Sequence, residues 1–391
     1  MCFDAIIIGA GPAGSAAATL LAKSGWSVAL IEKKLFPRPK VCGEFISGAT
    51  LPLLQQLGIW DQYRGSCGPE IRRVGLFARD TRVTARMPRA GNALGWGRAL
   101  GRHRLDTLLR DAALHAGATL FQPATVIALR RDGDSQACTV QSGDRQMELN
   151  APVVIAANGS WEPSALSDLR APSRRSDLFA FKARFSGAQL PHDLMPLLAF
   201  TGGYGGMVTT DGGLVTLSCC IRRDVLAAAR AHHPARHAGE SVLQHIFACC
   251  TPARDALGAA IPDTGWLAAG PIRPGIRISS GDPIFRVGNA AGEAHPVIAE
   301  GIAMAVQSAQ LLCDTLIEHR DRLSTEPGRR DAARAWSSAW RRAFAFRIRS
   351  SALVAQLAMS PRAAALLPVI GRFPSVLSFG AQLSGKARAA A

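Results

Sequence analysis

The stretch RPKVCGE, from Arg38 to Glu44, places a cysteine and a carboxylate beside two cations. Neighbouring cations favour a thiolate, so Cys42 could be a nucleophile or a redox thiol. The sequence offers no evident base, no nearby second cysteine and no partner ligands for a metal. We therefore expect Cys42 to be a small, polarisable residue in a pocket wall, and Glu44 to be the better candidate for delivering a proton.

Two other side chains could take part in proton transfer. His295 precedes Pro296, and an imidazole is well suited to acid–base work near neutral pH. The alternative for His295 is a polar turn residue. Tyr204 is one of only two tyrosines and lies in the stretch GGYGGM, which could line a pocket or form a plain hairpin. Cys42, Glu44, His295 and Tyr204 are thus the candidate catalytic residues.

These side chains need a scaffold, and the N-terminal residues predict one. The stretch FDAIIIGAGPAGSAAATLLAKSGWSVALIEKK contains an apolar run, a G-x-G-x-x-G loop, a helical run and a second apolar run. This order is typical of a strand, a phosphate-binding turn, a helix and a second strand. In such a unit Gly9 permits the tight turn, Gly11 the close approach of a pyrophosphate, and Gly14 the packing of helix on strand.

Glu32 follows the second apolar run. Its carboxylate can accept hydrogen bonds from both hydroxyls of a ribose, whereas it would repel a phosphate at the ribose 2′ position. The amide groups at the helix N-terminus would stabilise the pyrophosphate. The motif therefore predicts a dinucleotide site, but it does not distinguish NAD from FAD.

Four further segments, in order along the chain, carry a resemblance to a known family. They are RPKVCGE, RHRLD from Arg102, VVIAANGS from Val153 and VGNAAGEAHPVIAEGIAMA from Val287. Together with the glycine loop, they resemble the FAD-dependent oxidoreductases grouped with p-hydroxybenzoate hydroxylase and geranylgeranyl reductase. The Lys-x-Cys-Gly stretch is most similar to the geranylgeranyl-reductase-like flavoproteins.

This resemblance implies FAD as the cofactor and a set of residues that bind it. Glu32 would bind the adenosine ribose, Arg102 would lie near the pyrophosphate, and the Val126 backbone would lie near adenine. The full set of expected cofactor-binding residues is Gly9, Gly11, Pro12, Ala13, Gly14, Glu32, Lys33, Arg38, Cys42, Gly43, Arg102, Val126, Asn158, Gly159, Asn289, Gly292, Pro296, Gly301 and Ile302.

The resemblance also implies how the flavin end is held. The backbone around Gly301 and Ile302 would face the pyrimidine edge of the flavin, and Pro296 would pack near the ring. Asn289 stands where the family usually has an Asp that hydrogen-bonds the ribityl chain. An amide still donates and accepts hydrogen bonds, so we expect this contact to survive with one negative charge fewer near the flavin.

The expected fold class is α/β, with α+β character overall. Alternating runs such as LFAFKARF and GLVTLSCCI predict antiparallel strands between the segments of the nucleotide-binding unit. The expected parts are a discontinuous Rossmann-like FAD-binding domain (1–68, 98–171 and 271–325), an inserted antiparallel β-sheet substrate domain (69–97 and 172–270) and a C-terminal helical region (326–391).

Charge and composition limit the possible partners. The formal net charge is +16, but the arginines are scattered, and two tyrosines supply few stacking platforms, so we expect no nucleic acid. The tail from about Arg329 is apolar with basic flanks, so its helices could cap the core or contact an anionic membrane surface. The N-terminus lacks a signal-peptide pattern, and no apolar run reaches transmembrane length, so we expect a cytoplasmic, possibly membrane-associated protein.

The most favoured function is that of a monooxygenase acting on a hydrophobic, aromatic or polyketide-like small molecule. A reductase of carbon–carbon double bonds is the alternative. A flavin halogenase would need a lysine to handle hypohalous acid, and the substrate half offers only Lys182. A nucleotide-binding scaffold without turnover is the remaining option. Because no second G-x-G-x-x-G is present, NAD(P)H would bind transiently, or another protein would reduce the flavin.

Overall fold

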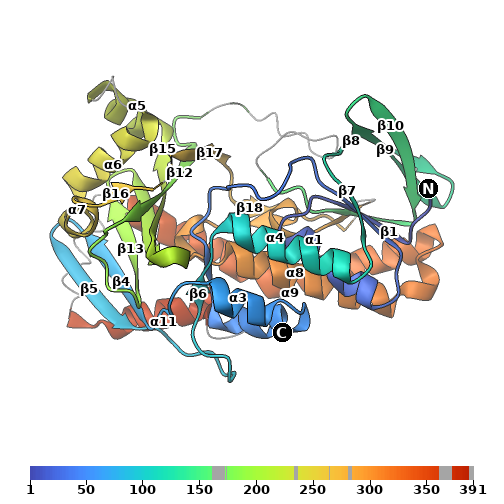
Figure 1. Cartoon of the computed structure of the whole chain (residues 1–391), viewed down its shortest axis with the longest axis horizontal. Helices are drawn as coiled ribbons and strands as arrows, with labels where there is room; N and C mark the ends of the chain where they lie inside the picture. The colour runs from blue at the N-terminus through green and yellow to red at the C-terminus, as the bar shows by residue number, and fades with distance from the viewer. Residues whose placement is uncertain are drawn as a thin grey trace.

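The computed structural model describes residues 1–160, 172, 174–232, 237–263, 265–280, 284–360 and 372–386. It confirms the expected α/β class, with a parallel sheet at one end of the molecule and a larger sheet at the other (Figure 1). The parallel sheet has the strand order β19-β11-β1-β2-β7. Its strands are β1 (Ala5–Ile8), β2 (Val28–Ile31), β7 (Thr119–Phe121), β11 (Val153–Ala156) and β19 (Phe285–Arg286).

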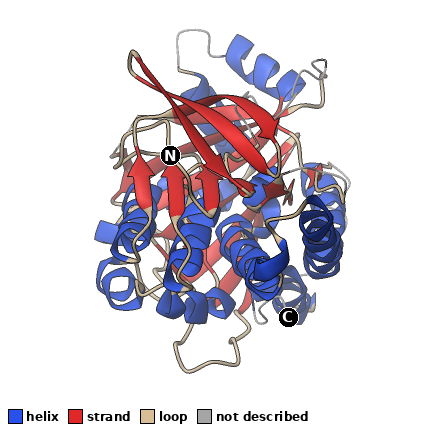
Figure 2. Ribbon diagram, turned by 90° about the vertical axis from the view of Figure 1, so that its right-hand side faces the viewer, coloured by secondary structure: helices blue, strands red, loops and turns tan. Residues whose placement is uncertain are grey.

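The two faces of the parallel sheet are covered differently (Figure 2). Ala5 and Ile7 of β1 pack into a core with the helices α1 (Pro12–Lys23), α4 (Arg102–His115) and α8 (Gly301–Glu318). Ile6 and Ile8 point the other way, into a core with a three-stranded antiparallel sheet. That sheet consists of β8 (Thr125–Asp132), β9 (Ser135–Ser142) and β10 (Arg145–Ala151). Because strand side chains alternate between faces, a fully apolar β1 is what such burial on both sides requires.

A second sheet has eight strands in the order β16-β12-β15-β14-β13-β4-β5, with β17 also paired to β12. Its strands are β4 (Arg73–Ala78), β5 (Thr81–Arg86), β12 (Leu178–Ser186), β13 (Leu194–Phe200), β14 (Gly203–Thr209), β15 (Val215–Arg222), β16 (Ile261–Pro262) and β17 (Leu267–Ile272). The pairing is antiparallel, as the sequence predicts, except that β13 runs parallel to β4. The GGYGGM stretch forms β14, between β13 and β15.

Helices cover one face of this larger sheet. They are α5 (Arg223–His232), α6 (Ala238–Cys249) and α7 (Thr251–Leu257), and Val242 and Ile246 of α6 are fully buried in the core that they share with the sheet. Short elements complete the connections: β3 (Phe45–Ile46) with β6 (Arg98–Ala99), β18 (Gly275–Ile276) with β20 (Gly292–Glu293), α2 (Leu51–Gln56) and α3 (Trp60–Ser66).

The described C-terminal part contains the long helix α9 (Glu326–Met359), the short helix α11 (Ser375–Ala381) and a helical turn, Gln382–Lys386. Helix α9 buries Trp336, Trp340 and Phe344 in the core that α1, α4 and α8 form against the parallel sheet, which we call the core of the nucleotide-binding half. Helix α11 packs on β4 and β5 of the larger sheet (Figure 1). Among the described helices, none combines the length and apolarity needed to cross a bilayer.

Candidate active site

A cavity of about 1180 Å³ lies between the parallel sheet and the larger sheet. The expected cofactor-binding residues line it, with the exception of Gly14, and so do the candidate catalytic residues Cys42, Glu44, Tyr204 and His295. Strands β12, β13, β14, β15 and β17 contribute the opposite wall. The cavity therefore brings the glycine loop of the N-terminus, the segment around Pro296 and the inserted sheet to one site.

The glycine loop has the geometry that a pyrophosphate requires. Gly9 has a φ of +105°, and a Cβ there would lie 2.7 Å from the Ala157 carbonyl oxygen. A Cβ on Gly14 would lie 1.8 Å from the Gly9 carbonyl oxygen, so Gly14 holds α1 against β1. Gly11 precedes α1 and faces open space in the cavity. The N-terminal amides of α1 are thus accessible to an anion, and the residues present fit the FAD pyrophosphate.

Glu32 lies at the carboxyl end of β2, and its side chain is almost fully buried. Its carboxylate accepts hydrogen bonds from the Ala10 amide at 2.9 Å and from the Lys34 amide at 2.8 Å. The Arg38 guanidinium lies 3.8 Å from it. A carboxylate has about four acceptor positions, so Glu32 keeps capacity for the ribose hydroxyls.

Arg102 begins α4 and is buried beside the cavity. Its Nε and Nη2 donate to the two oxygens of Asp106 at 2.7 and 2.8 Å, one helical turn later. Burial alone would lower the pKa of Arg102, but the Asp106 carboxylate and the Cys42 thiol together outweigh burial and raise that pKa. The guanidinium is therefore a fixed positive charge, as the expected position near the pyrophosphate demands.

Lys40, which the sequence places with Arg38 where the two cations could meet phosphate or substrate anions, lines the cavity. Burial lowers its pKa to about 8, and the nearby cations Arg102 and Arg38 add to this effect. A bound anion would raise that pKa again, since it favours the charged amine. Lys40 belongs to the RPKVCGE stretch, and its position two residues before Cys42 in the sequence indicates a place in the cavity wall.

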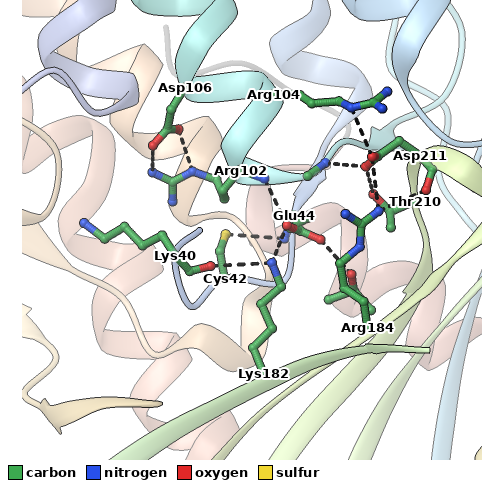
Figure 3. A network of polar contacts seen from close by, with 12 residues as sticks. Lys40, Cys42, Glu44, Arg102, Arg104, Asp106, Lys182, Arg184, Thr210 and Asp211 are labelled. Atoms are coloured by element: carbon green, nitrogen blue, oxygen red, sulfur yellow. Dashed lines mark hydrogen bonds and ion pairs between the residues drawn. The ribbon is translucent and has the colours of Figure 1, made fainter. Parts of the chain in front are cut away.

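Glu44 connects the nucleotide-binding half to the larger sheet (Figure 3). Its carboxylate forms a buried ion pair with Lys182 of β12, and it accepts hydrogen bonds from Thr216 Oγ1 of β15 at 2.6 Å and from the Arg102 amide at 2.9 Å. Its backbone has a φ of +62°, which is costly for a non-glycine residue. These three donors engage the carboxylate that the sequence marks as a candidate for delivering a proton, and they join the nucleotide-binding part to the larger sheet.

A second buried carboxylate, Asp211, strengthens the same junction (Figure 3). It accepts hydrogen bonds from the Gly101 amide at 2.7 Å and from Thr210 Oγ1 at 2.8 Å, and it lies 3.1 Å from the Arg184 guanidinium. Burial would raise the pKa of Asp211, but these donors and the Arg184 charge lower it. The larger sheet is therefore held against α4 by charged groups rather than by apolar packing alone.

Cys42 is half-buried in the cavity wall, and its Sγ accepts a hydrogen bond from the Glu44 amide at 3.3 Å. All nine cysteines are free thiols. Within the described part of the chain, no cluster of three or more His, Cys, Asp or Glu could hold a metal. This geometry favours the wall position that the sequence predicts for Cys42.

Tyr204 and His295, two candidate catalytic residues from distant parts of the chain, form a pair. The Tyr204 hydroxyl and the His295 Nδ1 lie 3.3 Å apart, and the His295 amide donates to Ser351 Oγ of α9 at 2.9 Å. Both residues line the cavity. Burial raises the pKa of Tyr204 well above its ordinary value and lowers the pKa of His295. The pair is therefore neutral near pH 7, with one exchangeable proton between a phenol and an imidazole.

A buried carboxylate, Glu293, lies beside the Asn289 side chain. The Asn289 side-chain amide donates to Glu293 Oε1 at 3.0 Å, and the Glu293 carboxylate also accepts from Ser160 Oγ at 2.6 Å. Glu293 is buried, lines the cavity and lies 3.5 Å from the Arg277 guanidinium. A negative charge therefore lies next to Asn289 on Glu293, where the Arg277 guanidinium faces it. With its nitrogen engaged, Asn289 can use its oxygen to accept from a ribityl hydroxyl.

We expect the Glu293→Gln substitution to weaken FAD binding by about tenfold. A glutamine can offer its own NH₂ group to Asn289, which allows the Asn289 amide to turn and replaces a charge-assisted hydrogen bond by a neutral one. Titration of the deflavinated protein with FAD, followed by fluorescence quenching, measures the change. Glu318→Gln, at the exposed C-terminal end of α8, is the control. An unchanged Kd in Glu293→Gln would show that Glu293 does not orient Asn289.

Comparisons with known proteins agree with this site. Residues 3–169 match the family model described as the FAD binding domain. The chain is 26% identical over 340 residues to conditioned medium factor receptor 1 of Dictyostelium discoideum, which covers 81% of this chain and 63% of the receptor. It is 29% identical over 160 residues to menaquinone reductase of Mycobacterium tuberculosis (41% and 38% covered) and 28% identical over 163 residues to squalene monooxygenase of Mus musculus (40% and 28% covered). The matches thus span less than two thirds of these relatives' own lengths.

Solved structures share the fold over nearly the whole chain. A flavin-dependent brominase superposes with a TM-score of 0.76 at 16% identity, covering 100% of this chain and 94% of the brominase. A geranylgeranyl bacteriochlorophyll reductase-like protein from Thermoplasma acidophilum superposes with a TM-score of 0.73 at 18% identity, covering 96% and 91%. The resemblance inferred from the five sequence segments is confirmed: residues 3–169 match the FAD binding domain, and the fold is shared with a geranylgeranyl bacteriochlorophyll reductase-like protein.

Proposed function

We propose that the protein is an FAD-dependent monooxygenase that hydroxylates a hydrophobic, aromatic or polyketide-like small molecule. One observation carries this proposal: the Tyr204–His295 pair faces a cavity that the FAD-binding segments share with an apolar sheet wall. Such a cavity can hold an apolar substrate against the flavin, and the pair can accept a proton from it.

The sheet wall of the cavity selects for apolar molecules. Most of the residues that its strands contribute are aliphatic or small: Ala180, Leu197, Met207, Val208, Cys219, Leu267, Ala268 and Ala269. Pockets of this kind bind ligands mainly through apolar burial and use a few polar groups for orientation. In this cavity Tyr204 and His295 are such polar groups on the side of the larger sheet.

The protonation states of the pair suit hydroxylation of a phenol. Because burial lowers the pKa of His295, its imidazole stays neutral and can accept a proton through Tyr204. Loss of the phenolic proton makes an aromatic ring more electron-rich, which favours its attack on an electrophilic oxygen. FAD supplies the oxygen activation when it is bound, and the chain binds the ring, excludes water and removes the proton. We infer that NAD(P)H, or a separate reductase, supplies the electrons.

Reduction of a carbon–carbon double bond is the second candidate. The match to menaquinone reductase, together with the Lys-x-Cys-Gly stretch, supports it. In that reaction the Tyr204–His295 pair would give a proton to the substrate rather than take one. Halogenation has less support, because the one lysine in the substrate half, Lys182, is buried in an ion pair with Glu44.

We expect an oxygen-dependence experiment to separate the two reactions. The FAD-loaded protein is photoreduced without oxygen and mixed either with 5-pentylresorcinol, a phenolic probe, or with a naphthoquinone that carries a prenyl side chain. A monooxygenase leaves the side-chain double bonds of the naphthoquinone intact, even where the quinone ring takes electrons from the flavin, and it incorporates one labelled oxygen atom into the resorcinol once oxygen is added. Reoxidation by the prenylated naphthoquinone under anaerobic conditions, with saturation of a side-chain double bond, would replace the proposal by the reductase function.

A further inference from the structure

The C-terminal helices expose large apolar side chains on one face each. On α9, Phe346, Leu353, Val354 and Leu357 are between 40% and 64% exposed. Their spacing of seven, one and three residues places them on one side of the helix. Isolated exposed leucines are ordinary in soluble proteins, but four large apolar residues on one helix face indicate an interaction surface.

The segment after α9 adds to this surface. Phe373, Val376, Phe379 and Leu383 are between 49% and 60% exposed. Val376 and Phe379 belong to α11, and Leu377 of the same helix packs on the larger sheet. Helix α11 therefore has one face on the protein and one face whose large apolar side chains, Val376 and Phe379, are at least half exposed. We call the eight exposed residues of α9 and 373–383 the C-terminal apolar face.

The two parts of the C-terminal apolar face meet at the cavity. Val354 of α9 and Val376 of α11 both line the cavity, although they are 40% and 50% exposed. The turn Gln382–Lys386 packs on α9, since a Cβ on Gly385 would lie 2.6 Å from Arg347 Cζ. The cavity thus reaches the surface between these helices, where Val354 and Val376 line it together with Ser384 and Lys386 of the turn.

Positive charge accompanies the apolar face. Arg342 and Arg349 are exposed on α9, and their positions four residues before and three residues after Phe346 place them on the same side of the helix. Arg372 is exposed next to Phe373. The formal net charge of the chain is +16. Arginine beside exposed Phe, Leu and Val is the combination that binds a lipid surface with anionic headgroups.

We propose that the C-terminal apolar face docks the protein on an anionic lipid bilayer, with the cavity opening toward the acyl chains. An apolar substrate dissolved in the bilayer then enters the cavity between α9 and α11 without crossing water. The proposal does not depend on which reaction the flavin performs, because it rests on the surface and the opening alone.

Sedimentation with vesicles tests the proposal on the FAD-loaded full chain. Vesicles of phosphatidylcholine with phosphatidylglycerol are compared with vesicles of phosphatidylcholine alone. We expect the wild type to bind the anionic vesicles more strongly, and Arg342→Gln combined with Arg349→Gln to weaken that binding by about thirtyfold. Leu353→Asp combined with Phe379→Asp should weaken it by more than about tenfold. Retained FAD absorbance and an unchanged Tm show that each variant is folded.

Two control variants match these substitutions elsewhere on the surface. Ile261→Asp alters an exposed apolar residue of the sheet edge, and Arg145→Glu reverses an exposed charge on β10; both should bind vesicles like the wild type. The proposal is overturned if the wild type binds neither vesicle, or if the patch variants bind as well as the controls. It is also overturned if light scattering shows a dimer that Leu353→Asp with Phe379→Asp dissociates, because the apolar face would then cover a second copy.

Discussion

Replacing Lys182 with Met is expected to lower the free energy of unfolding by about 3 to 5 kcal/mol. The Lys182 and Glu44 side chains are almost fully buried and form an ion pair. Without the ammonium group, the Glu44 carboxylate would keep only the Thr216 hydroxyl and the Arg102 amide as donors, in a site that water does not reach. A buried charge left without its counter-ion is among the most destabilising changes a single substitution can make.

Urea unfolding followed by circular dichroism and by flavin fluorescence measures this loss. Lys23→Met is the matched control, because Lys23 is exposed and donates to one backbone carbonyl, that of Gln56. It should change the free energy of unfolding by less than about 1 kcal/mol. Adding Glu44→Gln to Lys182→Met should restore part of the stability, since the amide carries no charge. If Lys182→Met is as stable as the control, Glu44 does not depend on the ion pair.

Much of the nucleotide-binding half could be predicted from the sequence because its signals are local. The strand, glycine turn, helix and acid of the first unit all lie within residues 5–32, and each residue's type is explained by its neighbours in the chain. The parallel pairing of β4 with β13 could not be predicted in this way. The two strands lie far apart in the chain, and the register between Arg73 and Leu194 is set by the packing of the whole sheet.

The same distinction holds for the site. Cys42, Tyr204 and His295 could be chosen from their residue types, but the contact between Tyr204 and His295 joins positions 91 residues apart, and the ion pair of Glu44 joins positions 138 residues apart. No local pattern reports such contacts. The contact of Glu293 with Asn289 is different, because the two residues are only four positions apart in the chain. An acidic residue so close to an Asn that replaces the usual Asp is a local signal for this contact.

Replacing Tyr204 with Phe is expected to lower turnover of a phenolic substrate by about a hundredfold or more, with a smaller change in KM. The variant keeps the ring that packs beside Cys220 and Ala355 but removes the hydroxyl that contacts His295. The proton then has no path from the substrate to the imidazole. Product formation from 5-pentylresorcinol in the presence of oxygen measures the effect. Tyr63→Phe is the control: Tyr63 is the other tyrosine, it donates to the Arg98 carbonyl oxygen, and it does not line the cavity.

The pH profile distinguishes proton transfer from a loss of packing. His295 acts only as the neutral imidazole, and burial holds its pKa below the ordinary value of about 6.5. The kcat/KM of the wild type should therefore stay constant as the pH falls to about 6.5 and decline at lower pH, where His295 takes up a proton. In His295→Gln this decline should disappear, at a lower rate throughout. If Tyr204→Phe and His295→Gln keep the wild-type rate and acid limb, the pair has no part in the reaction and serves only to join β14 to the segment around Pro296.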